Sequence, residues 1–199
     1  MFNYLELYSI MGLSAALLVK GGIMIILGLM VGSFLNVCIW RVPRAESIVF
    51  PRSHCPNCRV TLKIRNLLPV LSYLAQGGRC SYCAIRISPV YPLVELITAL
   101  SFFAVFLWGP SGFVPKLVGI ILISTLIVIT FIDIRFQIIP DLITLPGVVT
   151  GLLIHGMIHV SRLAGWVDSP SLTGVIFWDS FLGALVGGAV LWGVAVVSE

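Results

Sequence analysis

The chain has 199 residues, of which 59% are hydrophobic and only 10% charged, and its mean hydropathy is +1.10. A chain this apolar cannot cover itself with a water-soluble surface, so the composition excludes the soluble classes and indicates an integral membrane protein. The apolar stretches are continuous rather than alternating, which predicts transmembrane helices that pair their own backbone groups.

Positive charge is concentrated in one loop, although the formal net charge is only +4. Residues 41–86 contain eight of the twelve Lys and Arg residues and a single acidic residue, Glu46. Basic loops shorter than about 60 residues remain in the cytoplasm by the positive-inside rule. We therefore expect this loop to be cytoplasmic. The asymmetry accounts for the charge by itself, so we expect no nucleic-acid partner.

Five membrane-spanning helices are expected along the chain. They lie within residues 11–40 and near residues 91–109, 114–133, 142–159 and 175–197. Each approaches the roughly 20 apolar residues that cross a bilayer. Glycines are frequent in the first and last of these spans, where small residues let helices pack closely. We find no internal repeat in the sequence.

The cytoplasmic loop contains two C-x2-C pairs separated by 21 residues, Cys55 with Cys58 and Cys80 with Cys83. This spacing is typical of a structural four-cysteine zinc site, in which four thiolates leave no open position for water. Two disulfides are the alternative, and the reducing cytoplasm disfavours them. His54 beside the first pair is interpreted as a bystander.

The expected fold is an all-α integral membrane protein with about five transmembrane helices and a small cytoplasmic zinc-knuckle domain between the first and second. The expected divisions are residues 1–40 for the first span, 41–90 for the zinc domain and 91–199 for the helical core. The apolar stretch 67–74 is too short to span a membrane. It either packs inside the zinc domain or lies on the membrane surface.

Three acidic residues near the cytoplasmic ends of the spans are candidates for function. A carboxylate at mid-bilayer costs about 2.5–3.5 kcal/mol on insertion scales, so an acid at the membrane edge suggests a site. Asp133 is either functional or simply the end of its helix, and Asp141 behind Pro140 is interpreted as a helix cap. Glu95 either receives substrate or pairs with Arg86 or Asn36 to hold the zinc domain on the spans.

Four stretches together resemble the type IV prepilin peptidase family of membrane aspartic proteases. They are GSFLNVCIWRVPR (residues 32–44), the cysteine segments PRSHCPNC and LLPVLSYLAQGGRCSYC, YPLVELITAL (residues 91–100) and FIDIRFQIIPDLITLPG. The resemblance implies that Asp133 is one of two catalytic aspartates. It also implies a bacterial inner-membrane location, prepilin or pseudopilin substrates cut at the cytoplasmic face, and N-methylation from S-adenosylmethionine.

The sequence departs from the family pattern at two points. Val90 stands where the family usually has Arg, and the Gly-x-Gly-Asp motif of the second aspartate is absent from the 199 residues. We therefore expect a C-terminally truncated family member that is inactive alone. The alternatives are a non-catalytic membrane scaffold or assembly factor with a zinc knuckle, and a cytoplasmic domain that works mainly as a methyltransferase.

Overall fold

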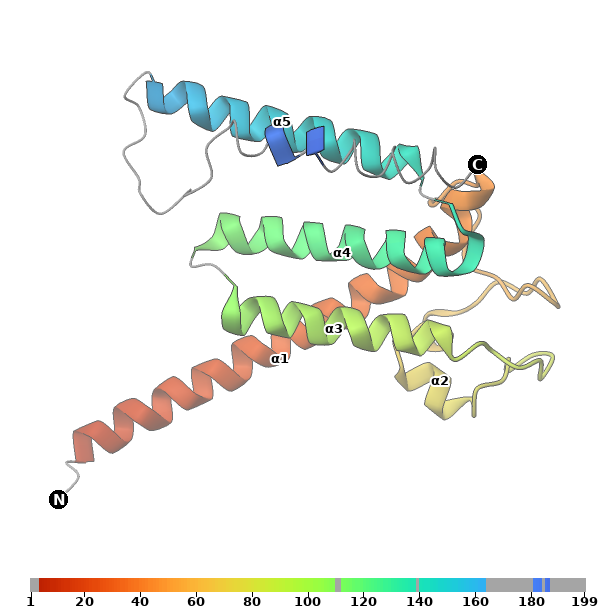
Figure 1. Cartoon of the computed structure of the whole chain (residues 1–199). Helices are drawn as coiled ribbons and strands as arrows, with labels where there is room; N and C mark the ends of the chain where they lie inside the picture. Colours follow the sequence, from red (N-terminus) through yellow and green to blue (C-terminus); the bar gives the residue numbers. More distant parts are fainter. Residues whose placement is uncertain (1–3, 110–111, 139, 164–180, 184, 187–199) are drawn as a thin grey trace. The chain divides into compact units, whose positions relative to one another are not determined.

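The computed structural model describes residues 4–109, 112–138, 140–163, 181–183 and 185–186, which form helices and contain no β-strand (Figure 1). The chain divides into two compact units, Met1–Ile139 and Pro140–Glu199, and each is described by itself.

The first unit contains three helices that are long and apolar enough to cross a membrane. They are α1 (Tyr4–Arg41), whose apolar part lies within Leu17–Arg44, α3 (Val90–Trp108) and α4 (Phe113–Phe136). These helices agree with the first three expected spans to within a few residues. The helical class is therefore confirmed for this unit.

The second unit contributes α5 (Asp141–Leu163), near the fourth expected span. Its described apolar part, Asp141–Ile154, is shorter than the three spans of the first unit. The expected fifth span lies almost entirely outside the described residues. The number of five spans therefore stays a prediction.

Helix α1 packs against α3 at two glycines, as the small-residue pattern predicts. A Cβ atom added to Gly28 would lie 2.5 Å from Ala99 Cα, and one added to Gly32 would lie 2.7 Å from Glu95 Cα. The two backbones thus touch with no space for a side chain between them. Gly22, on the same helix, has nothing within 4 Å of such an atom.

The contact between α1 and α3 forms the core of the first unit. Phe102 and Val94 of α3 are fully buried, as is Ile132 of α4. Asn36 of α1 is also buried, and its amide donates a hydrogen bond of 3.0 Å to the Tyr91 carbonyl. This bond fixes the end of α1 against the beginning of α3, where both helices meet the cysteine-containing loop.

The loop between α1 and α3 is built from turns and short helices, η1 (Val42–Arg44), η2 (Ile64–Asn66) and α2 (Leu71–Ala75). Helix α2 contains no buried residue. Its leucines, Leu71 and Leu74, are 65% and 67% exposed. Of the two expectations for residues 67–74, packing inside the zinc domain is therefore wrong, because most of this segment's leucine surface faces outward.

Candidate metal centre and the acidic residues beside it

The two C-x2-C pairs are held by two hairpins of the same construction. In each hairpin the first cysteine donates its N–H to the carbonyl five residues on, 3.0 Å for Cys55 to Val60 and 2.9 Å for Cys80 to Ile85. Both cysteine carbonyls accept an N–H from four residues on, at 2.9 Å, from Arg59 and from Ala84. The hairpins therefore repeat with an offset of 25 residues.

The equivalence extends to the ends of the hairpins. Isolated bridges join His54 to Thr61 and Arg79 to Arg86, in matching positions on either side of each cysteine pair. The residue after each pair adopts a left-handed conformation, with φ of 57° at Arg59 and 54° in the second hairpin. The two hairpins are therefore copies of one backbone pattern, as the two C-x2-C pairs indicated. They share apolar residues at matching positions after each pair, Val60 and Ile85.

The four thiols converge on one point. The sulfur atoms of Cys55, Cys58, Cys80 and Cys83 all lie within 4.8 Å of one another, and the Sγ atoms of Cys55 and Cys83 are 3.7 Å apart. Zinc bound to four thiolates at about 2.3 Å places its sulfurs roughly 3.8 Å apart in a tetrahedron. The geometry and the all-sulfur donor set therefore fit zinc. All four cysteines are free thiols rather than disulfides, and His54 lies outside the cluster.

The thiols differ in how readily they give up a proton. A backbone hydrogen bond from Val60 lowers the pKa of Cys58, but desolvation and the neighbouring thiols outweigh it and raise the pKa to about 11. Hydrogen bonds from the Ile85 backbone and the Asn57 side chain lower the pKa of Cys83 to about 6. At neutral pH one thiolate is thus ready for a metal, whereas Cys58 must lose its proton to bind.

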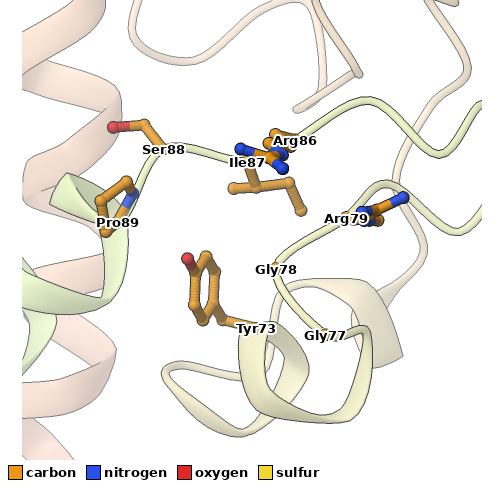
Figure 2. A pocket seen from close by; sticks show the side chains of 8 residues that line it. All are labelled: Tyr73, Gly77, Gly78, Arg79, Arg86, Ile87, Ser88 and Pro89. Atoms are coloured by element: carbon orange, nitrogen blue, oxygen red, sulfur yellow. The ribbon is translucent and has the colours of Figure 1, made fainter.

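A hollow of about 570 Å³ lies beside the second hairpin (Figure 2). Figure 2 shows the Tyr73 ring rising from α2 between Gly78 and Pro89, below Ile87. Arg79 and Arg86, on the same lining, are exposed cations. The hollow is therefore lined by the second metal hairpin, α2 and the residues just before α3.

Glu95 of α3 is buried and contacts the loop between the two hairpins. Its Oε2 accepts a hydrogen bond of 2.7 Å from the Val70 backbone N–H, and the Ser33 side chain of α1 bonds the same carboxylate. The prediction that Glu95 pairs with Arg86 or Asn36 is therefore wrong. The Val70 N–H was beyond sequence reasoning because its position depends on the folded loop.

The backbone at Val70 has a conformation that a β-branched residue rarely adopts, with φ of 58° and ψ of −49°. The Leu71 N–H bonds the Pro69 carbonyl across it, which defines a γ-turn of the rare, strained kind. Such strain persists only where the surroundings determine it. Glu95 supplies that constraint by accepting the N–H of the turn's central residue.

A second buried charge, Arg41, ties the beginning of the loop to the end of α1. Its guanidinium donates hydrogen bonds of 2.7 Å to the carbonyls of Ser47 and Pro51. Among the residues that the structure describes, no carboxylate forms an ion pair with Arg41. Sequence reasoning counted this residue only as part of the basic loop.

Asp133 is an exposed residue in the last turns of α4. Its carbonyl accepts the Gln137 N–H at 2.8 Å, and Gln137 ends the helix in a left-handed conformation with φ of 53°. The helix thus continues past Asp133 by about one turn. An exposed carboxylate near the end of the helix agrees with both interpretations of Asp133, so its functional role stays a prediction.

Aromatic and basic side chains fasten this end of α4 to the end of α1. The Arg44 guanidinium lies 3.7 Å from the Trp40 ring centroid and 5.0 Å from that of Phe136. The Arg135 guanidinium lies 4.6 Å from the same Trp40 ring. Because α1 leads directly into the cysteine loop, Asp133 lies at the same end of the first unit as the metal centre.

Asp141 belongs to the second unit, where it is the exposed first residue of α5. The carbonyl of Pro140 accepts the N–H groups of Ile143 and Thr144, so Pro140 occupies the N-cap position before the helix. The interpretation of Asp141 as the cap was therefore off by one position. Its carboxylate in the first turn is still placed favourably toward the helix dipole.

Two family models match most of this chain. Residues 26–108 match the bacterial peptidase A24 N-terminal domain, and residues 120–197 match the type IV leader peptidase family. The first match covers the metal domain with α3, and the second includes Asp133. No solved structure gives a significant match to the chain.

Curated relatives extend the likeness over most of the chain. A prepilin leader peptidase/N-methyltransferase of Klebsiella pneumoniae is 39% identical over 181 residues, which cover 87% of this chain and 72% of the relative. A type 4 prepilin-like proteins leader peptide-processing enzyme of Escherichia coli is 40% identical over 80% of this chain. A prepilin leader peptidase/N-methyltransferase of Myxococcus xanthus is 40% identical over 81% of it. The matches span only 61% and 44% of the lengths of the latter two relatives. The chain belongs to the type IV leader peptidase family.

Proposed function

We propose that this protein is a membrane aspartic endopeptidase that removes the leader peptides of type IV prepilins or type II secretion pseudopilins at the cytoplasmic face of the bacterial inner membrane. The observation that carries the proposal is Asp133, an exposed carboxylate near the end of an apolar helix, on the side of the metal domain, in a chain of this family. The basic loop supports a cytoplasmic position for that side.

The chemistry needs a second carboxylate close to Asp133. Two carboxylates a few ångströms apart do not both ionise, so one keeps a proton. The protonated partner polarises the scissile carbonyl, and the ionised partner takes a proton from the attacking water. The four-cysteine site, if loaded with zinc, has no open coordination position, so its role in this scheme is to order the cytoplasmic domain.

The second carboxylate is absent from the 199 residues as a Gly-x-Gly-Asp motif. Asp141 stands at the beginning of α5 and belongs to no such motif. We infer that the 199 residues alone do not cleave a prepilin, and that a segment carrying the motif has to be supplied. The names of two relatives include an N-methyltransferase, which supports methylation as a second activity of this protein. Methylation of the new N-terminus, with S-adenosylmethionine as the donor, is part of the proposal.

The proposal is tested by leader removal from a purified prepilin in detergent. The chain is compared with a version extended by the Gly-x-Gly-Asp segment of a relative. We expect cleavage only by the extended version, and Asp133→Asn should lower its rate by about 10³-fold or more. Asp141→Asn is the matched control and should retain activity.

Two results would contradict the proposal. One is cleavage by the unextended chain that depends on Asp133, which would remove the need for a second motif. The other is an extended version that keeps full activity as Asp133→Asn, which would favour a non-catalytic role for this residue.

A further inference from the structure

The linker between the two metal hairpins exposes an unusual amount of apolar surface. We call residues 64–74 the apolar linker, which comprises η2, the Val70 turn and most of α2. Ile64, Leu71 and Leu74 are 83%, 65% and 67% exposed. In the hairpins themselves, the exposed residues Val60, Ile85 and Tyr82 are only 39%, 39% and 42% exposed. The linker is therefore more exposed than the hairpins that it connects.

The hydrogen bond to Glu95 sets the depth of the apolar linker relative to the membrane. Glu95 lies in the second turn of α3, a helix long and apolar enough to span, and its carboxylate holds the Val70 N–H at 2.7 Å. The adjacent leucines, Leu68 and Leu71, therefore lie beside the end of a spanning helix, where the polar surface of a bilayer begins.

Charges around the apolar linker match an anionic lipid surface. Lys63 precedes the linker, Arg65 lies within its first turn, and the exposed Arg79 follows its end. Residues 47–94 contain no Asp or Glu. Basic residues next to apolar side chains are the pattern by which segments bind the interface of membranes containing anionic lipids. A protein partner would also need to cover the leucines, but the depth set by Glu95 and the one-signed charge favour lipid.

We propose that the apolar linker inserts its leucine and isoleucine side chains into the cytoplasmic leaflet and so fastens the metal domain to the bilayer surface. Glu95 acts as the positioning residue that holds the Val70 turn against the spans. This membrane attachment does not depend on peptidase activity, because every residue that it uses belongs to the linker, α3 or the neighbouring basic residues.

The segment 47–51, which Arg41 holds through two backbone carbonyls, also combines a buried charge with exposed apolar side chains. Val49 and Phe50 are 66% and 73% exposed, and Arg41 binds the carbonyls on either side of them. Both loops that are held by a buried charge at the end of a spanning helix thus present apolar side chains outward. The pattern supports lipid as the common partner, since each loop is tied at the level of the membrane surface.

The proposal is tested with the full chain loaded with zinc and reconstituted in vesicles of phosphatidylglycerol and phosphatidylcholine. An environment-sensitive fluorescent amino acid replaces Leu71 in one sample and Tyr82, an exposed aromatic residue of the second hairpin, in the control. Lipids with a nitroxide near the top of the acyl chain serve as quenchers from the membrane, and iodide serves as a quencher from water. A zinc content equal to that of the unsubstituted protein shows that the domain is folded.

We expect the nitroxide lipids to quench the label at position 71 several-fold more than the label at position 82, with the reverse order for iodide. Equal lipid quenching at both positions would overturn the proposal. A label at position 71 that neither quencher reaches would also overturn it, because protein would then cover the linker. Placing the label at position 74 repeats the test if the first substitution lowers the zinc content.

Discussion

The close contact between α1 and α3 predicts that Gly28→Ala destabilises the protein although alanine is the better helix former. The added Cβ would lie 2.5 Å from Ala99 Cα, and ordinary van der Waals contact begins at 3.4 Å, so the helices must separate by about 0.9 Å. The opposing atoms are backbone and cannot move aside as a side chain can. A gap of 0.5–1 Å forfeits roughly a quarter to a half of each contact along the interface.

Gly22→Ala is the matched control for this change. It makes the same substitution on the same helix, where an added Cβ meets nothing within 4 Å. Exchanging Gly for Ala in a helix gains up to about 1 kcal/mol in either variant, so the difference between the two removes that term. Overpacking costs about 1–3 kcal/mol, and this is the expected difference in free energy of unfolding.

Thermal unfolding in detergent, followed by tryptophan fluorescence, measures the effect. A difference of 1 kcal/mol corresponds to about 2–4 °C for a protein of this size, so Gly28→Ala should melt several degrees below Gly22→Ala. If Gly28→Ala melts at or above the control, the two backbones do not touch at this crossing. The position of Glu95, which faces Gly32 one turn further along, would then need revision.

Three further predictions concern the metal domain and its attachment. Metal analysis of the purified chain should find one zinc ion. Cys80→Ser should lower this zinc content and speed proteolysis of the loop, as followed by gel. A Cys80→Ser protein with full zinc would contradict the four-thiolate site. Zinc affinity should fall as the pH is lowered, because binding must displace the proton of Cys58, whose pKa of about 11 keeps it protonated at neutral pH. Titration in weak buffer should detect proton release, and binding without it would show that the thiols are already ionised. Glu95→Ala should lower the free energy of unfolding by about 1–3 kcal/mol, because it leaves the Val70 N–H without its acceptor, whereas Glu95→Gln keeps an acceptor oxygen. Trypsin should therefore cut the loop faster in the alanine variant than in the glutamine variant. Equal rates would mean that the hydrogen bond does not hold the loop.

Features set by local sequence were predictable. Continuous apolar runs located α1, α3 and α4, because the length and composition of a span are set by the bilayer. The spacing of the four cysteines predicted their convergence, because two C-x2-C pairs on tight turns bring their sulfurs within reach of one metal ion. The position of Asp133 near the end of its helix followed in the same way from the apolar run before it.

Features that depend on contacts between distant segments were not predictable from the sequence alone. Glu95 was expected to pair with a cation or an amide. Its carboxylate instead accepts the backbone N–H of Val70, 25 residues away in the sequence, and the γ-turn at Val70 directs this N–H toward Glu95. Leu71 and Leu74, which follow the same turn, are exposed. Periodicity cannot locate such a turn, because no residue in LLPVLSYL has the conformational freedom of glycine that usually signals one.

Two buried charges connect the metal domain to the spans, and neither has an ionic partner among the described residues. Arg41 is satisfied by the carbonyls of Ser47 and Pro51, and Glu95 by the N–H of Val70 and the side chain of Ser33. A buried charge is costly unless such bonds are made, so the spans favour a folded loop that offers its backbone at these points. Metal binding folds the same loop. The four-cysteine domain is therefore coupled to α1 and α3 through hydrogen bonds to the loop backbone, and loss of zinc should weaken the hydrogen bonds of both Arg41 and Glu95.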